Sequence, residues 1–283
     1  MGLRINTNVP ALIAQRNLRT TRTHLDRSLE RLSSGTRINH AADDAAGLAI
    51  SESLRAQIRG LNQAERNAQD GISLVQVAEG GLAEISNILI RMRELGVQAA
   101  SDTVGHQERS FLDIEFQQLL EEIDRIARST EYNRVPLLNG TTSTFEIQVG
   151  VGNNPAIDRI KLFGGNHPAD VNVTALGINL ASVADKPSAQ TSLALIDSAM
   201  TAAISIRSEF GAMQNRLQSV INNLGISKEN LSAANSRIRD TDIAEETTEL
   251  TKQNILMQSG VSVLGQANTT IKTALNLLGG GAG

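Results

Sequence analysis

The apolar positions of the chain form long stretches in which they recur every three or four residues. In the C-terminal half this pattern covers residues 196–238 and includes one polar member, Ser227. Alternating spacings of 3 and 4 are the a/d pattern of a coiled coil, so the stretch predicts a helix of about six heptads, on the order of 60 Å long. Its apolar members are Ile196, Ala199, Ala203, Ile206, Phe210, Met213, Leu217, Val220, Leu224, Leu231, Ala234 and Ile238.

The N-terminal half shows the same pattern in two pieces. The first predicted seam consists of Leu82, Ile85, Leu89, Met92, Gly96 and Ala99, and the second of Leu112, Phe116, Leu119, Ile123 and Ile126. Between them, residues 101–105 supply the cap and breaker residues that end one helix and start the next. Three such seams together favour one elongated helical bundle.

The centre of the chain follows a different period. All five prolines lie at position 10 or between 136 and 187, so two long proline-free zones flank this central region. Within it, Phe145, Ile147 and Val149 alternate with polar residues, and Ile160 and Leu162 flank Lys161. A period of two predicts strands. The fold class is therefore mainly α: a coiled-coil-like helical hairpin or bundle with a small β-hairpin inserted over about 136–187.

Both ends of the chain carry narrow apolar stripes. The residues recur at heptad spacing within segments that are otherwise rich in Thr, Asn, Gln and Ser, so neither helix buries its stripe alone. Single helices of this kind are marginal in water. We therefore expect both ends to be frayed or disordered in the monomer and to become ordered helices among partners. The stripe residues are Ile5, Leu12, Leu18, Leu25 and Leu32, then Ile243, Leu250, Met257, Leu264, Ile271 and Leu278.

Composition excludes several classes of function. The chain of 283 residues has 26 Lys and Arg against 30 Asp and Glu, which gives a net charge of −4 and argues against a nucleic-acid partner. There is no cysteine for disulfides, thiolate metal sites or thiol catalysis. The first residues lack the apolar core of a secretory signal, and no apolar run is long enough for a bilayer, so we expect no membrane insertion.

No catalytic arrangement emerges from the polar residues. The four histidines, His24, His40, His106 and His167, lie far apart and lack metal-ligand spacing. No phosphate-binding glycine motif is complete, and the adjacent pair Asp43 and Asp44 suits helix capping or salt bridging better than acid–base chemistry. We predict that the protein is not an enzyme and holds no cofactor or metal.

Two long motifs resemble the signatures of bacterial flagellins. The N-terminal motif is LSSGTRIN at residues 32–39 followed by AADDAAGLAI at 41–50. The C-terminal motif is ENLSAANSRIRDTD at 229–242, and it continues through TKQNIL at 251–256 to GQAN at 265–268. The resemblance covers about 1–140 and 188–278, and motifs of this length are highly specific.

This resemblance implies a fold and a function. The terminal helices, residues 1–40 and 241–283, would pair and form the inner core of a filament, with the stripe residues as the self-assembly contacts. Residues 41–240 would form a helical rod that includes the 136–187 insertion. The short centre implies that the large variable outer domains are missing.

The resemblance also implies a route and partners. Flagellins leave the cell through the flagellar type III export channel, which would place this protein outside the cell in a homopolymeric flagellar filament. The implied partners are other copies of the chain, an export chaperone at the C-terminal segment, and the flagellar cap and hook-associated proteins. A hook–filament junction protein shares the terminal helices and export route and is the nearest alternative. The seams alone would also permit an intracellular coiled-coil scaffold.

A further surface is similar to a known recognition segment. Residues 89–98 resemble the flagellin segment that vertebrate Toll-like receptor 5 recognises, and Glu115 matches a contributing acidic position. Arg91, Leu95 and Gln98 lie on one stripe beside the seam. The same surface is also expected to be the lateral contact between protofilaments.

Overall fold

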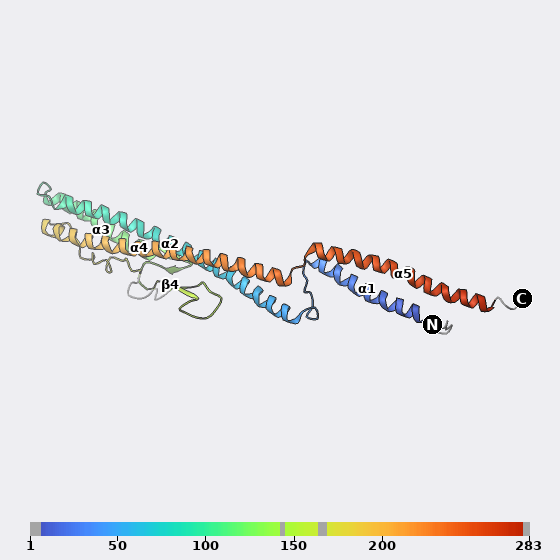
Figure 1. The fold of residues 1–283 in the computed structure, drawn as a ribbon. Coiled ribbons are helices and arrows are strands. Elements are labelled where there is room, and N and C mark those ends of the chain that lie inside the picture. Colours follow the sequence, from blue (N-terminus) through green and yellow to red (C-terminus); the bar gives the residue numbers. More distant parts are fainter. Residues whose placement is uncertain (1–6, 142–144, 164–168, 280–283) are drawn as a thin grey trace. The chain divides into compact units, whose positions relative to one another are not determined.

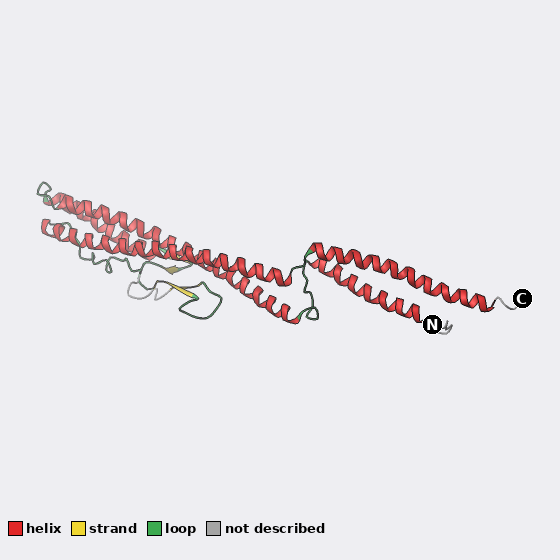
Figure 2. Cartoon of the chain, in the orientation of Figure 1, coloured by secondary structure: helices red, strands yellow, loops and turns green. Residues whose placement is uncertain are grey.

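The fold is mainly helical, with four short strands in the part of the chain that is described (Figures 1 and 2). The computed structural model describes residues 7–141, 145–163 and 169–279, and the side chains of Phe163, Ile271 and residues 274–279 are not included. Among the stripe residues, Ile5 and the side chains of Ile271 and Leu278 therefore lie outside the description. The helices are α1 (Val9–Ser34), α2 (Ala45–Ala99), α3 (His106–Ser129), α4 (Lys186–Arg239) and α5 (Ile243–Gly279), and the strands are β1 (Glu131–Tyr132), β2 (Val135–Pro136), β3 (Phe145–Gln148) and β4 (Arg159–Phe163).

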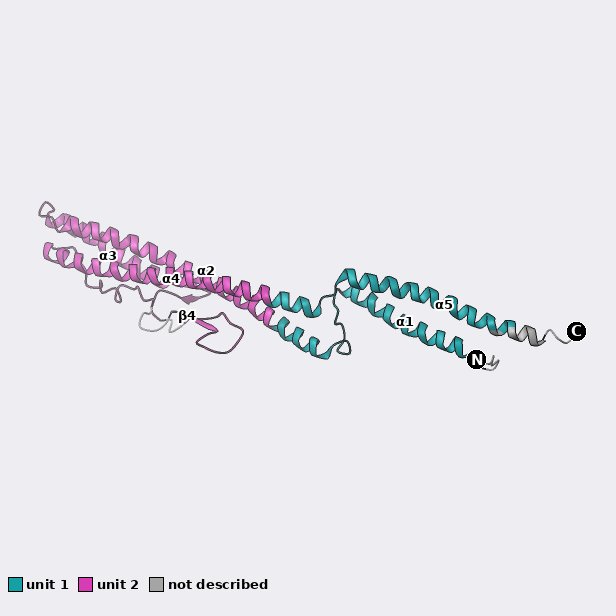
Figure 3. Ribbon diagram, in the orientation of Figure 1, with its two compact units in different colours: residues 1–56, 231–283 teal, residues 57–230 magenta. Residues whose placement is uncertain are grey.

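The chain divides into two compact units (Figure 3). Unit 1 consists of residues 1–56 and 231–283, and unit 2 of residues 57–230. The two ends of the chain thus share a unit. The long helices α2 and α4 contribute residues to both units.

Unit 2 is built around the predicted seams. Leu82, Ile85 and Leu89 of α2 are completely buried, as are Phe116 of α3 and Leu217 of α4. These side chains belong to one continuous apolar cluster, which confirms the seams predicted from the 3 and 4 spacing as far as Val220 in α4; the last predicted members, Leu231, Ala234 and Ile238, are half-buried and lie outside the cluster. Removing this apolar area from water is the main favourable term in the folding of the unit.

A buried arginine, Arg109, binds the carbonyls at the C-terminal end of α2, a contact that residue spacing does not predict. Arg109 Nε donates to the carbonyl of Ala99 at 2.8 Å, and its Nη2 donates to the carbonyl of Ser101 at 2.9 Å. Carbonyls at a helix C-terminus have no partner within the helix, and a cation there also complements the helix dipole. The break between α2 and α3 falls at residues 100–105, within one residue of the predicted 101–105.

The central insertion contains the predicted β-hairpin. Strands β3 and β4 pair antiparallel, with Phe145 opposite Phe163 and Ile147 opposite Ile160. The hairpin lies close to α2, because a Cβ atom added at Gly71 would lie 3.3 Å from Ile147 Cγ1.

A second, smaller hairpin precedes it. Strands β1 and β2 pair through Tyr132 and Val135, and the two residues between them, Asn133 and Arg134, have φ of 50° and 64°. Two central residues with positive φ make the type I′ turn, which matches the twist of a tight hairpin. This hairpin was not predicted, because Asn-Arg lacks the glycine that usually marks such a turn.

Candidate self-assembly site

The two terminal helices of unit 1 have clear local start and stop signals. Asn8 caps α1, since its Oδ1 accepts the backbone N–H of Ala11 at 3.0 Å. The helix ends at Gly35, whose φ of 70° favours glycine and whose N–H donates to the Arg31 carbonyl at 2.8 Å. Asp242 caps α5, and its Oδ1 accepts a backbone N–H two residues further on at 2.8 Å.

Helices α1 and α5 pack side by side and run antiparallel (Figure 1). At one end, Asn8 Nδ2 donates to the Ala267 carbonyl at 3.2 Å. At the other, Arg31 Nη1 lies 3.5 Å from Glu246 Oε2. These two contacts define the antiparallel register, in which the numbers of an α1 residue and of the α5 residue facing it add up to about 275–277.

The interface between α1 and α5 contains few large buried apolar groups. Its most buried side chains are small or polar: Ala14, Ser28, Glu246 and Gln253. Leu18 packs over Gly260, where an added Cβ atom would lie 2.7 Å from Leu18 Cδ2. The larger stripe residues on this interface are all half-buried, namely Leu18, Leu25, Leu32, Leu250, Met257 and Leu264.

The helical order of both ends differs from the sequence expectation. We expected frayed or disordered ends in the monomer, but the structure has a 26-residue helix in α1 and a 37-residue helix in α5. The physical reason is that each stripe covers part of the other. The two helices cover each other's stripe only in part, since its leucines stay half-buried and keep a fraction of their contact with water.

Several large apolar residues of unit 1 remain exposed. Two of them, Leu12 and Ile243, belong to the predicted stripes and are 56% and 52% exposed. Helix α5 exposes apolar side chains on several sides, which is typical of a helix that is surrounded by protein. The exposed set consists of Val9, Leu12, Ile13, Leu29, Ile50, Ile243, Ile255, Leu256, Val261 and Val263.

The signature motifs form the connectors next to these helices. Thr36 and Asp240 make an antiparallel bridge, the Arg37 N–H donates to the Arg239 carbonyl at 2.6 Å, and the Thr241 N–H donates to the Gly35 carbonyl at 3.1 Å. The two connectors are therefore tied to each other by backbone hydrogen bonds.

Carboxylates also stabilise the region around the two connectors through hydrogen bonds and ion pairs. The backbone N–H of His40, and then that of Asn39, donate to Asp43 and hold its pKa below the ordinary value, with Arg27 adding attraction. The Arg239 guanidinium lowers the pKa of Glu52 in the same way. The expected capping or salt-bridging role of Asp43 is confirmed. Asp44 also caps, because its Oδ1 accepts the Gly47 N–H at 2.8 Å.

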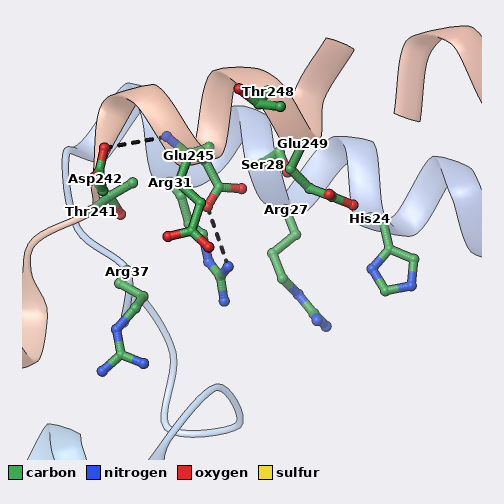
Figure 4. A pocket seen from close by; sticks show the side chains of 11 residues that line it. His24, Arg27, Ser28, Arg31, Arg37, Thr241, Asp242, Glu245, Thr248 and Glu249 are labelled. Atoms are coloured by element: carbon green, nitrogen blue, oxygen red, sulfur yellow. Dashed lines mark hydrogen bonds and ion pairs between the residues drawn. The ribbon is translucent and has the colours of Figure 1, made fainter. Parts of the chain in front are cut away.

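A polar groove of about 520 Å³ lies where α1 meets the start of α5 (Figure 4). Cations from the α1 side face carboxylates from the α5 side, and the Arg31–Glu246 ion pair crosses it. Arg31 Nε and Thr241 Oγ1 are buried without a hydrogen-bond partner among the described residues. The lining consists of His24, Arg27, Ser28, Arg31, Arg37, Thr241, Asp242, Glu245, Glu246, Thr248 and Glu249.

The residues predicted to form the receptor-recognition surface are only partly brought together. Arg91 Nη2 and Nε donate to Glu115 Oε1 at 2.8 and 3.0 Å, which joins α2 to α3, and Nη1 donates to Glu94 at 2.9 Å. These carboxylates raise the pKa of Arg91, Glu115 more than Glu94. Gln98 is exposed. Leu95 is 1% exposed and lies in the core of unit 2, so the expectation that it belongs to the surface stripe was wrong.

The reason for that error is geometric. The seam of α2 passes through both Met92 and Gly96, and Leu95 is adjacent to both on the helix. A bundle with helices on two sides buries a stripe wider than a/d, and Leu95 falls in the widened part. Glu94 also pairs with the Arg91 guanidinium and was not predicted. Its position three residues after Arg91 on the same helix is the sequence signal that would have identified it.

The part of the chain that the structure describes contains neither a metal-binding cluster nor a membrane-spanning helix. No group of three or more His, Cys, Asp or Glu side chains there is placed to hold a metal ion. Over the same residues, no helix is both apolar and long enough to cross a bilayer.

Comparison with known proteins identifies the family. The bacterial flagellin N-terminal helical region matches residues 5–143, and the bacterial flagellin C-terminal helical region matches residues 193–278. The flagellin of Halalkalibacterium halodurans is 48% identical over 276 residues, covering 97% of this chain and 99% of the relative. The chain belongs to the bacterial flagellin family. The flagellin of Bacillus subtilis is 42% identical over 306 residues, covering 98% of this flagellin and all of the relative.

A solved structure shares the fold at lower identity. A putative flagellar hook-associated protein from Vibrio parahaemolyticus is similar with a TM-score of 0.56 and 16% identity, over 70% of this flagellin and all of that chain. At this identity the likeness concerns the fold alone. Flagellins are the structural subunits of the bacterial flagellar filament, and this flagellin is such a subunit.

Proposed function

We propose that α1 and α5 are the self-assembly core of this flagellin. Residues 1–40 and 241–283 would form the inner filament core, and residues 41–240 the surrounding rod with its 136–187 insertion. The observation that carries the proposal is the set of large apolar side chains that unit 1 leaves exposed on α1 and α5. Exposed apolar surface of this extent marks a protein–protein interface.

The energetics favour assembly through this surface. Burying one Leu, Ile or Val side chain contributes about 1.5–3 kcal/mol, so several such residues per copy supply a substantial driving force. The stripe residues Leu12 and Ile243 would be buried between copies, and the half-buried ones would be covered further. Contacts between unlike surfaces that do not close on themselves give helical filaments.

An exposed residue away from the α1–α5 interface tests the proposal. Ile255 is 58% exposed, so Ile255→Asp leaves the pairing with α1 intact and puts a charge where another copy would bind. We expect no filaments by electron microscopy and an unchanged far-UV circular dichroism spectrum of the monomer. The matched control is Ile157→Asp, because Ile157 is 74% exposed in unit 2. Filaments from the Ile255 variant as abundant as those from the control would refute this role for α5.

We further propose export through the flagellar type III channel, with the chain located in the extracellular filament. The absence of cysteine and the marginal burial within unit 1 support threading of an unfolded chain. An export chaperone at the C-terminal segment, and the cap and hook-associated proteins, are the proposed partners. Filaments in the cell-free fraction support this route, whereas a purely intracellular chain points to a scaffold.

A second proposed property is recognition by Toll-like receptor 5. The exposed Arg91–Glu115 ion pair favours it, because it lies on a surface that also exposes apolar side chains of α2 and α3. Leu95 would then support this surface from the core, while Arg91, Gln98 and Glu115 contact the receptor. Binding to the receptor ectodomain should fall in an Arg91→Ala/Glu115→Ala variant, and equal binding would leave the surface as a protofilament contact.

The proposed role includes no catalysis and no cofactor. Copy number separates it from the nearest rival, since a filament contains thousands of copies and a hook–filament junction only about a ring of them. Quantifying this chain against a hook protein in isolated flagella decides between the two.

A further inference from the structure

The charges of unit 1 are unevenly distributed along α1. Arg16, Arg19 and Arg22 follow each other at i, i+3 and i+6, which places them on one ridge of the helix. All three are exposed. None of their guanidinium groups has a hydrogen-bond or ion-pair partner among the described residues, whereas Arg27 and Arg31 of the same helix reach Asp43 and Glu246.

The opposite charge gathers at the start of α5. Residues 240–249 contain five carboxylates and no Lys or Arg. Two of the five have basic or amide partners: Glu246 forms an ion pair with Arg31, and Glu249 accepts hydrogen bonds from Lys252 and Gln253. In the described part of the chain, the Asp240, Asp242 and Glu245 side chains make no salt bridge, and Asp242 serves as the helix cap.

The two groups cannot meet within one molecule. In the antiparallel register of α1 and α5, the arginine ridge lies opposite residues 255–261, and the whole stretch 253–271 contains no charged residue. The centre of the acidic segment lies some fourteen residues nearer the start of α5, which is about 20 Å along a helix with a rise of 1.5 Å per residue.

A second copy of the chain, shifted along the helix axis, would place its acidic segment opposite the arginine ridge. We propose that the ridge of Arg16, Arg19 and Arg22 binds Asp240 and Glu245 of a neighbouring copy that is displaced along the helix axis. The proposal rests on the proposed assembly through α1 and α5. Leu12 lies one turn before Arg16 and is exposed, so the ridge is continuous with the apolar assembly surface. The apolar contacts would then supply affinity, and the charges would select the displacement between copies.

The test is polymerisation onto filament seeds at low ionic strength, with the critical concentration measured by sedimentation. One variant reverses the ridge, Arg16→Glu/Arg19→Glu/Arg22→Glu. A second retains its charge, Arg16→Lys/Arg19→Lys/Arg22→Lys. A third combines the reversed ridge with Asp240→Lys/Glu245→Lys, and Asp242 is left in place because it caps α5. Circular dichroism of each monomer verifies that helix content is unchanged.

We expect the reversed ridge to raise the critical concentration about ten-fold, because three cations that attract the two carboxylates of the neighbouring copy become three anions that repel them. The lysine variant should stay within about two-fold of the natural chain, and the combined variant should recover most of the loss. The effect should shrink in 1 M salt, where the Debye length is about 3 Å. A reversed ridge that polymerises normally, or a combined variant no better than the reversed ridge alone, overturns the proposal. Failure of the natural chain to polymerise would instead refute the proposed function.

Discussion

The two units of this flagellin bury different kinds of side chain. Unit 2 buries large apolar residues completely, with α2, α3 and α4 all contributing to one cluster. The apolar side chains that unit 1 buries, among those described, are Ala14 and Ile38, and its other buried side chains are polar: Ser28, Ser51, Glu246 and Gln253. Unit 2 therefore completes its core within one molecule, whereas unit 1, apart from Ile38, keeps its large apolar groups at or near the surface.

The difference follows from the sequence of the facing helices. In unit 2, large residues of all three helices, such as Leu89, Phe116 and Leu217, are completely buried between smaller seam residues such as Ala199 and Ala203. In unit 1, small or polar residues occupy the tightest positions, and Gly260 gives room to Leu18. Close approach through small residues pairs the helices without enclosing much apolar area, which leaves apolar surface for other copies.

Truncating one leucine in each unit should give the largest difference between the units in the free energy of unfolding. Leu89→Ala empties a completely buried site in unit 2 and should lower the free energy of unfolding by about 2–5 kcal/mol. Leu25→Ala removes a half-buried side chain in unit 1 and should cost about 1 kcal/mol or less in the monomer. Urea unfolding followed by circular dichroism measures both. Equal losses would mean that the two units have equivalent cores.

Two adjacent glycines of α2, one in a crowded site and one in open space, test the packing of unit 2 at single positions. A Cβ atom at Gly81 would lie 2.5 Å from Thr130 Oγ1, which is held by its bond to the Ile126 carbonyl, so Gly81→Ala should destabilise by about 1–3 kcal/mol. Gly80 has open space around it, and Gly80→Ala should stabilise by about 0.5–1 kcal/mol. Thermal unfolding of the two variants should shift in opposite directions, and shifts of the same sign would contradict the packing described.

The matching glycine pair in α5 should show a smaller effect. A Cβ atom at Gly260 would meet the end of the Leu18 side chain, which is half-buried and has room to move, so Gly260→Ala should cost less than about 1 kcal/mol in the monomer. Its control, Gly265→Ala, has no atom within 4 Å and should raise helix content slightly. Circular dichroism of the monomers records both changes. A Gly260 variant as damaging as the Gly81 variant would show a rigid α1–α5 interface.

Acidification should have the smallest effect, and near the connectors of unit 1 it should act through Asp43 and Glu52. Asp43 and Glu52 have pKa values below their ordinary ones, so each contributes stability that is present above about pH 4 and is lost as pH falls through the lowered pKa. Nuclear magnetic resonance should show the His40 amide losing its protection only below the ordinary pKa of an aspartate, about 4. Asp43→Asn should abolish this dependence on pH, and a transition above pH 5 would exclude these carboxylates as its cause.

Much of unit 2 is predictable from residue spacing. The alternation of 3 and 4 locates the buried faces of α2 and α4, and the period of two locates β3 and β4, because each spacing is imposed by backbone geometry. Leu95 was expected at the surface and is buried, and the role of Arg109 was not anticipated. The width of a buried stripe and the partner of a buried cation depend on which helices surround them. The turn at Asn133 and Arg134 depends on backbone angles that these side chains do not dictate.

For the assembly site, the sequence locates the stripes but not their environment. Heptad spacing identifies Leu12 and Leu18 equally, yet Leu18 packs on Gly260 whereas Leu12 is exposed. The register between α1 and α5 decides this, and it depends on contacts such as Arg31 with Glu246 between residues far apart in the chain. Pattern alone does not show that the ends form a helical pair in which each stripe is half covered.

Hydrogen exchange of the monomer and the filament tests the central claim most directly. In the monomer, amides of α1 and α5 should exchange at least about a hundred-fold faster than those of residues 82–99 and 196–224, because little apolar burial opposes local opening in unit 1. In the filament, α1 and α5 should become as slow as unit 2. Monomer amides in α1 and α5 as protected as those of unit 2, with no change on assembly, would contradict the account.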